Sequence, residues 1–122
     1  MGYDVYDSEC PARAVLDHVG DKWALLVLNR LSEGPVRFNA LRREIRGLSQ
    51  KVLSQVLKRL ERDGLISRKA FATVPVTVEY ALTGLGECLT ANVVPLLRWA
   101  EANMVQIKSA QVAYDGRMAE AA

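Results

Sequence analysis

The pattern of apolar and polar positions is clearest in residues 49–64, which read SQKVLSQVLKRLERDG. The apolar positions recur at the spacing of one helical face, and they are Val52, Leu53, Val56, Leu57 and Leu60. Ser49 is a predicted N-cap, because its hydroxyl can accept from an amide of the first turn. Gly64 is the predicted stop, since glycine tolerates the left-handed conformation just past a helix end. The pattern predicts an amphipathic helix.

The face opposite those apolar positions carries cations and neutral polar groups but no acid. At about 100° per residue it consists of Lys51, Ser54, Gln55, Lys58 and Arg62. A merely solvated face usually interleaves acids with bases. The single sign of charge therefore favours a helix that contacts DNA, with the cations at phosphates and with Gln55 and Ser54 at base edges.

Two helices are predicted before the first strong break in the chain. Pro11 suits a first helical turn, because its missing amide costs nothing there, and residues 12–19 continue that helix. Asp21 is a plausible N-cap for residues 22–31, whose centre is apolar on nearly all sides. That helix should be the buried central one, and Gly and Pro within residues 32–35 end it.

A helix-turn-helix is predicted next. Residues 37–45 form a third short helix, with Arg42 and Arg43 facing outward. A tight turn with a glycine, residues 46–48, leads into the helix of residues 49–64. Two short helices joined in this way, the second basic on its outer face, are typical of the helix-turn-helix.

After residue 64 the spacing of the apolar residues changes from that of a helix to that of β-strands. Residues 65–72 and 76–82 are rich in β-formers, and residues 73–75 lie between them as a hairpin tip. A two-stranded hairpin after a recognition helix is the wing of a winged helix. Arg68 and Lys69 are expected to meet the DNA backbone beside the helix, although such a ribbon also packs on the core.

The C-terminal third is predicted to be helical and partly unpartnered. Thr83 is the expected N-cap, the helix reaches about Val112, and Pro95 should kink or divide it. An apolar stripe consists of Leu96, Leu97, Ala100, Met104 and Ile107. So small a core has no obvious room for this stripe, so it predicts pairing with a second copy of the chain. Residues 115–122 are expected to fray.

Composition adds one observation to this picture. The chain has 122 residues, which fits one domain, and a net charge of only +2. Residues 37–69, however, hold ten Lys or Arg and three acids, a net +7, while the remainder nets −5. A basic middle between acidic flanks indicates a positive surface aimed at a polyanion. Chance clustering and an acidic protein partner are the alternatives.

Other function classes find little support. Cys10 and Cys88 do not make a disulfide framework, the N-terminus does not read as a signal peptide, and the apolar runs are too short to span a bilayer. We therefore expect a cytoplasmic protein without membrane contact. His18 is the single histidine and has no ligand set around it, and no phosphate-binding glycine loop occurs. We expect no enzyme, no metal and no cofactor.

Several fragments, in this order and spacing, resemble the HxlR-type winged helix-turn-helix regulators of bacteria. They are Cys10-Pro11; Gly20-Asp21-Lys22-Trp23; Arg37-Phe38 with Leu41; Gly47-Leu48-Ser49 with Lys51 and Leu53; Leu57, Leu60, Glu61, Gly64, Leu65, Ile66 and Arg68; and Val78-Glu79-Tyr80 with Leu82-Thr83 and Gly86. The similarity runs from about Cys10 to Trp99. It implies a dimeric transcription factor, joined through N- and C-terminal helices, on a pseudo-palindromic operator of double-stranded DNA.

The resemblance also bears on the wing and on the two thiols. Family members often carry a basic residue where this chain has Thr77, so a minor-groove contact from the wing tip is not expected. A cysteine matching Cys10 is the usual sensor of oxidants or electrophiles in the family. A helix N-terminus beside Cys10 favours the thiolate, with help from Arg13 if it approaches, whereas nearby acids oppose it. A packing role is the alternative for Cys10, and Cys88 is expected in the core.

Together these observations predict a mainly α fold with a small β-hairpin, a winged helix-turn-helix with extra N- and C-terminal dimerisation helices. Residues 1–122 form one domain, with a DNA-binding core at 11–82 and dimerisation helices at 83–114. The predicted DNA contacts are Arg37, Arg42, Arg43, Ser49, Lys51, Ser54, Gln55, Lys58, Arg62, Arg68 and Lys69. We expect a repressor that responds to oxidants or electrophiles through Cys10. A protein-interaction module and a regulator with a non-redox effector are the alternatives.

Overall fold

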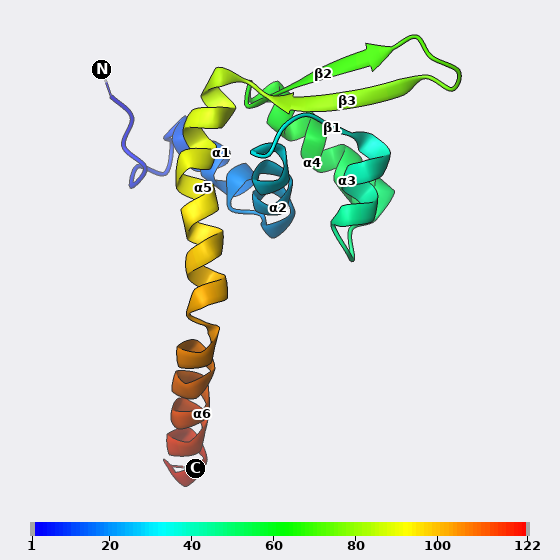
Figure 1. The fold of residues 1–122 in the computed structure, drawn as a ribbon. Helices are drawn as coiled ribbons and strands as arrows, with labels where there is room; N and C mark the ends of the chain where they lie inside the picture. The colour runs from blue at the N-terminus through cyan, green and yellow to red at the C-terminus, as the bar shows by residue number, and fades with distance from the viewer. Residues whose placement is uncertain (1, 122) are drawn as a thin grey trace.

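The computed structural model describes residues 2–121, in which a long helical arm extends from a body of helices and a small sheet (Figure 1). The elements of this part of the chain are α1 (Pro11–Val19), α2 (Lys22–Leu31), β1 (Val36–Arg37), α3 (Phe38–Glu44), α4 (Gln50–Arg62), β2 (Ile66–Phe71), β3 (Thr77–Leu82), α5 (Gly84–Ala102) and α6 (Met104–Ala121). The mainly helical fold with a small antiparallel sheet is as predicted.

The core forms around α2 and the inner face of α4. In α2, Val27 and Leu28 are fully buried, which confirms the prediction of a central helix. In α4 the buried residues are Leu53, Val56, Leu57 and Leu60, four of the five apolar positions that the sequence pattern selected. Burying that face leaves the polar face of α4 outside.

Side chains cap three helices as their sequence positions predicted. Asp21 accepts from the Trp23 amide, and Ser49 and Thr83 accept from the amides three residues on. Each cap satisfies an amide that the first turn of the helix leaves unpaired. Gly64 follows α4 with φ +76°, the left-handed conformation expected of the glycine that ends this helix.

The sheet has three antiparallel strands in the order β1-β3-β2. The hairpin of β2 and β3 was predicted, although both strands are slightly shorter than the predicted runs. The sequence did not reveal β1, whose Val36 and Arg37 pair with Tyr80 and Glu79 of β3. A strand of two residues has no period to detect, and it forms here because β3 offers an unpaired edge. Consequently α3 begins at Phe38 rather than at Arg37.

The first turn of α5 lies directly against the end of α4 and the start of β2. A Cβ on Gly86 would stand 2.0 Å from the carbonyl oxygen of Leu65, so only glycine permits this approach. The Thr83 hydroxyl also donates to the carbonyl oxygen of Gly64 at 2.6 Å. These contacts fix the base of the arm to the body.

The C-terminal third departs from the expectations at two points. The helix is not divided at Pro95, which lies inside α5, but at Asn103. Ala91, whose carbonyl loses its partner at Pro95, is exposed like Pro95 itself, so water can hydrate that carbonyl. The tail expected to fray from residue 115 is helical to Ala121, and residue 122 lies outside the described residues. Several alanines, the best helix formers, favour this helix.

Candidate nucleic-acid interface

The predicted contact residues belong to four consecutive elements and the cap before α4. Arg37 lies in β1, Arg42 and Arg43 in α3, Ser49 at the cap, Lys51, Ser54, Gln55, Lys58 and Arg62 in α4, and Arg68 and Lys69 in β2. All are exposed except Ser54, which is half-buried. The Ser49 hydroxyl accepts from the Val52 amide at 3.1 Å and keeps its own proton for a further partner.

The cations of this set make no ion pair with any residue between 2 and 121. Some cations elsewhere in the body and the arm do form ion pairs. Arg30 pairs with Glu33 and Glu44, and Arg98 pairs with Glu101. The surface of α3, α4 and the hairpin therefore keeps positive charge that the fold does not neutralise locally, as a surface for a polyanion requires.

The sheet register separates two of the predicted contacts. Side chains alternate along a strand, so Arg68 and Lys69 project from opposite faces of β2. Lys69 and Arg37 both pair in register with Glu79, one on each side of it, and this acid offsets part of their field. The Lys69 ammonium also lies 5.0 Å from the centroid of the Phe71 ring. The structure thus does not bring Arg68 and Lys69 to one surface.

Two polar contacts hold the end of α4 against the preceding helices. His18 Nδ1 lies 2.7 Å from Asp63 Oδ2, and Arg59 lies 3.6 Å from the carboxylate of Asp21. His18 and Asp63 are 45 positions apart, and no periodicity in the sequence links them. Arg59 is thereby directed to the body, although it belongs to the same helix as the outward cations. The position of α4 is coupled to α1 and to the α1–α2 turn.

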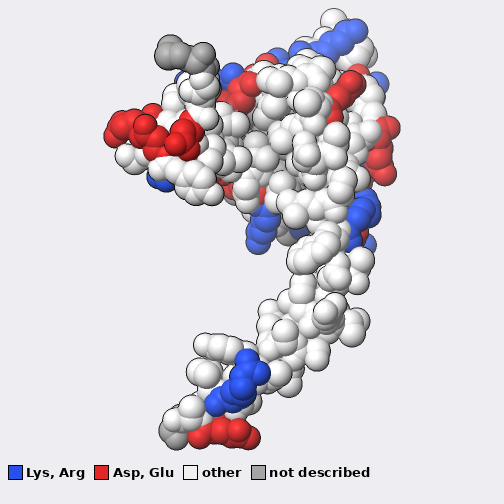
Figure 2. Space-filling model, turned by 90° about the vertical axis from the view of Figure 1, so that its left-hand side faces the viewer, with Lys and Arg blue, Asp and Glu red and all other residues white. Residues whose placement is uncertain are grey.

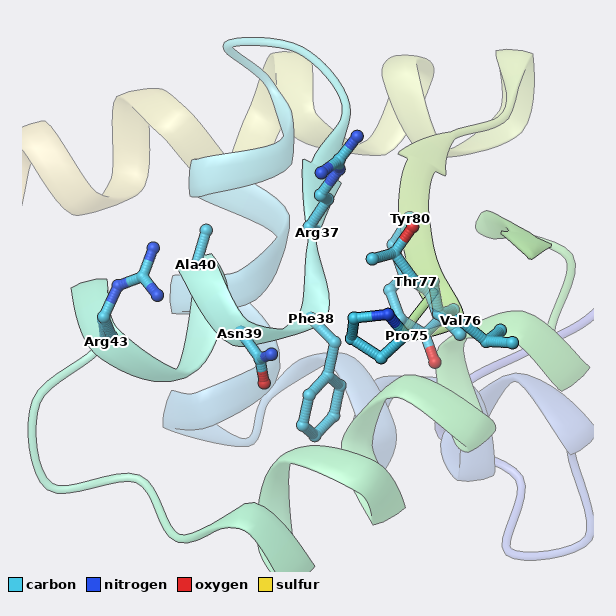
Figure 3. Close-up of a pocket in the computed structure, with 10 residues that line it drawn as sticks. Arg37, Phe38, Asn39, Ala40, Arg43, Pro75, Val76, Thr77 and Tyr80 are labelled. Atoms are coloured by element: carbon cyan, nitrogen blue, oxygen red, sulfur yellow. The ribbon is translucent and has the colours of Figure 1, made fainter. Parts of the chain in front are cut away.

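A cavity of about 440 Å³ lies between α3 and the hairpin (Figure 3). Its walls are Arg37, Phe38, Asn39, Ala40 and Arg43 on one side and Pro75, Val76, Thr77, Val78 and Tyr80 on the other. This cavity could not be predicted from the sequence, because the pairing of β1 with β3 brings these two segments together.

The two cysteines lie in different surroundings. Cys10 is the N-cap residue of α1, and 9% of its surface is exposed. The Arg13 guanidinium donates to the carbonyl oxygens of Val5 and Tyr6, so its donors are engaged there. The prediction that Cys88 is a core residue was wrong, since Cys88 is exposed. The buried positions of α5 fall on a different side of that helix.

The outer surface of α1, α5 and α6 is rich in exposed apolar side chains. An apolar groove between α1 and α5 is lined by Val15, Leu16, Val19, Asp63, Leu65, Leu85, Cys88, Leu89 and Asn92. No described residue of α6 is buried. Of the predicted stripe, Leu96 and Met104 are exposed and the other three members are half-buried. Figure 2 shows the arm free of Lys, Arg, Asp and Glu over much of its visible face.

No helix within the described residues is long and apolar enough to cross a membrane. The succession of α3, a tight turn, α4 and the β2–β3 hairpin instead defines a winged helix-turn-helix. This is an architecture of DNA-binding transcriptional regulators.

Comparison with known proteins agrees with this class. The model of the HxlR-like helix-turn-helix family matches residues 18–108, and the chain belongs to that family. The chain is 44% identical over 104 residues to YtfH of Escherichia coli (strain K12), described as an uncharacterized HTH-type transcriptional regulator; the match covers 85% of this chain and 82% of YtfH. Its family and relatives are transcriptional regulators and not enzymes.

Two solved structures show the same fold. YtfH from Salmonella typhimurium superposes with a TM-score of 0.87 at 40% identity, over 90% of this chain and 98% of the other. The redox regulator HypR in its reduced form superposes with a TM-score of 0.73 at 34% identity, over 81% of this chain and 98% of HypR. The winged helix-turn-helix prediction is confirmed.

Proposed function

We propose that α4 enters the major groove of operator DNA, with Gln55 and Ser54 at base edges. An amide matches the donor and acceptor pattern of adenine, and a serine hydroxyl can serve either role. The proposed phosphate contacts are Arg42, Arg43, Ser49, Lys51, Lys58, Arg62 and Arg68, with weaker contributions from Arg37 and Lys69 beside Glu79. The absence of ion pairs at these cations within residues 2–121 is the observation that carries the proposal.

The functional unit in this proposal is a homodimer. Apolar surface is exposed in the groove between α1 and α5 and along the arm. A second copy of the chain, with the same apolar surface, would bury it in a symmetric interface. Residues 11–82 then form the DNA-binding core, and residues 83–114 supply dimerisation helices. Two α4 helices about 34 Å apart would meet successive major grooves of a pseudo-palindromic operator.

Regulation by such a dimer is expected to be repression, because a protein seated on an operator excludes other proteins from the same DNA. Its proposed target is the chromosome, so the protein would act in the cytoplasm. An acidic protein partner for the basic surface is the competing function.

Selection of bound fragments from the organism's genome tests the proposal. A specific regulator should enrich a few fragments and bind them about 10³-fold or more tighter than bulk DNA. A basic surface that serves an acidic protein would enrich no fragment, and its affinity for all DNA would be alike. That second outcome would overturn the proposed function.

A response to oxidants or electrophiles through Cys10 is the second part of the proposal. Cys10 caps α1, whose other end contacts α4 through His18 and Asp63, so modification at α1 has a physical route to the recognition helix. HypR, a redox regulator, has the same fold. Attack of the thiolate on a peroxide would form a sulfenic acid and release the second oxygen as water or an alcohol.

Two single-cysteine variants test this response. Cys10→Ser should keep its operator affinity in peroxide, whereas Cys88→Ser should lose affinity as the wild type does. Mass spectrometry of both variants identifies the oxidised thiol. Equal loss of affinity in Cys10→Ser and in the wild type would assign Cys10 a packing role only.

A further inference from the structure

We propose that the cavity between α3 and the wing binds a small aromatic carboxylate, which would act as an effector. The cavity volume of about 440 Å³ falls within the range of about 300–1,000 Å³ common to small-molecule sites. It is formed by two separate segments of the chain that the β1–β3 pairing holds together.

One side of this cavity suits an anion. Figure 3 shows Arg43 at the left of the lining residues and Asn39 between Arg43 and Phe38, both on α3, with the Arg37 guanidinium above them. Neither guanidinium is paired with a carboxylate of the described chain. Guanidinium groups bind carboxylates through paired, charge-assisted hydrogen bonds. Glu79, the nearest acid in the register, does not line the cavity.

The remaining wall suits an aromatic ring. Phe38 supplies an aromatic face from α3, and Pro75, Val76 and Val78 supply apolar surface from the hairpin. Most of the Val76 side chain is exposed, at 68%. Covering these groups with an apolar ligand would remove apolar surface from water, which favours binding.

Tyr80 adds a polar group to the residues that line the cavity. The residue lines the cavity and is only 8% exposed, yet its hydroxyl forms no hydrogen bond with residues 2–121. Every fully enclosed side-chain polar atom in this range has a partner. The Tyr80 hydroxyl must therefore remain accessible, and it can donate to a carboxylate oxygen.

These features favour a small aromatic anion over a DNA phosphate. A phosphate of duplex DNA needs cations but gains nothing from an apolar wall of proline, valine and phenylalanine. A benzoate-sized molecule fits the volume and uses both walls.

Binding at this cavity would oppose DNA binding. Arg43 is among the proposed phosphate contacts, and a carboxylate on its guanidinium group would compete for it. This competition rests on the proposed function, whereas binding of the carboxylate to the free protein does not. The two steps are therefore measured separately.

The first experiment titrates the isotope-labelled protein, without DNA, with benzoate and follows amide chemical shifts. Benzoate should shift residues of α3 and of the hairpin and bind in the millimolar range expected for so small a ligand. Benzamide, which lacks the charge, and inorganic phosphate, which lacks the ring, should each bind at least about tenfold more weakly. Absence of benzoate shifts at the cavity, or equal binding of benzamide, would overturn the site. Equal binding of phosphate would reduce it to a general anion site.

Single substitutions test whether benzoate binds in this cavity. Arg43→Gln should weaken benzoate about tenfold, and Tyr80→Phe, which keeps the ring and the packing, should weaken it several-fold. Arg46→Gln is the matched control, because Arg46 is exposed and does not line the cavity, and it should leave benzoate affinity unchanged. Equal affinity of wild type and Tyr80→Phe would remove the hydroxyl from the site.

The second experiment measures operator affinity at increasing benzoate, at constant ionic strength maintained with chloride. Apparent operator affinity should fall several-fold as the cavity fills, and benzamide should have no such effect. If benzoate binds the free protein and operator affinity does not change, the effector role fails while the binding site stands. If no DNA is bound at all, the proposed function fails and the first experiment is unaffected.

Discussion

The helices α4 and α6 have opposite relations to the rest of the molecule. α4 has 13 residues, and its apolar stripe, from Leu53 to Leu60, is buried in the protein's own core. α6 is longer, with 18 residues, and none of its described residues is buried. Both helices carry exposed side chains, but they differ in the kind of partner that these side chains need.

The apolar side chains of α4 are already buried within one chain. The outward cations Lys51, Lys58 and Arg62 make no ion pair in the part of the chain described here, and the partner that we propose for them is an anion. In α6 and at the end of α5, apolar side chains remain exposed. The partner expected there is another apolar surface, and a second copy of the chain provides one.

Breaking the proposed dimer should have the largest effect. Ile107→Asp places a charge in the apolar stripe, and Gln106→Asp places the same charge on an exposed neighbour outside that stripe. We expect Ile107→Asp to sediment as a monomer and to bind operator about 10²–10⁴-fold more weakly, because the second half-site is no longer tethered. Gln106→Asp should remain a dimer. Two dimeric variants of equal affinity would contradict the role assigned to the arm.

Removing buried volume from α4 should have the next largest effect. Leu53 is fully buried, and Leu53→Ala should lower the free energy of unfolding by about 2–5 kcal/mol in chemical denaturation. Val105 of α6 is 86% exposed and lies outside the stripe, so Val105→Ala should change that free energy by less than about 0.5 kcal/mol. Similar losses in both variants would show that α6 is buried as deeply as α4.

Loss of a base contact should have a smaller and more selective effect. Gln55→Ala should reduce discrimination among operator variants by about 1–3 kcal/mol for the base pair it contacts. Gln111 of α6 is also exposed, and Gln111→Ala should bind all variants as the wild type does. Competition titrations with singly substituted operators measure both. Unchanged discrimination in Gln55→Ala would remove Gln55 from base recognition.

Features that repeat along the chain could be predicted from the sequence. The 3.6-residue period of α4 and the three capping side chains depend on near neighbours, and each was located correctly. The helix-turn-helix and its wing followed from their order. The candidate contacts on α4 were found because four of its five apolar positions, once buried, left the opposite face outside.

Features that depend on distant pairs could not be predicted. β1 exists only because β3 offers an edge 44 positions away, at Tyr80 opposite Val36. The His18–Asp63 contact and the cavity beside Tyr80 arise in the same way. Cys88 was misplaced because a residue beside Leu89 looks apolar in sequence, whereas the rotation of α5 directs it outward. Long-range pairing leaves no local period to detect.

The salt dependence of operator binding tests most directly whether the unpaired cations meet phosphates. The logarithm of operator affinity should fall linearly with the logarithm of salt concentration, by about 0.9 for each phosphate contact. Lys58→Ala should lower that slope by nearly two in a dimer, one contact being lost in each protomer, and should weaken all DNA sequences alike. Lys108→Ala, which removes an exposed cation of α6, should leave the slope unchanged. A shallow slope in the wild type, or the same slope in Lys58→Ala and Lys108→Ala, would contradict a DNA-binding role for this surface.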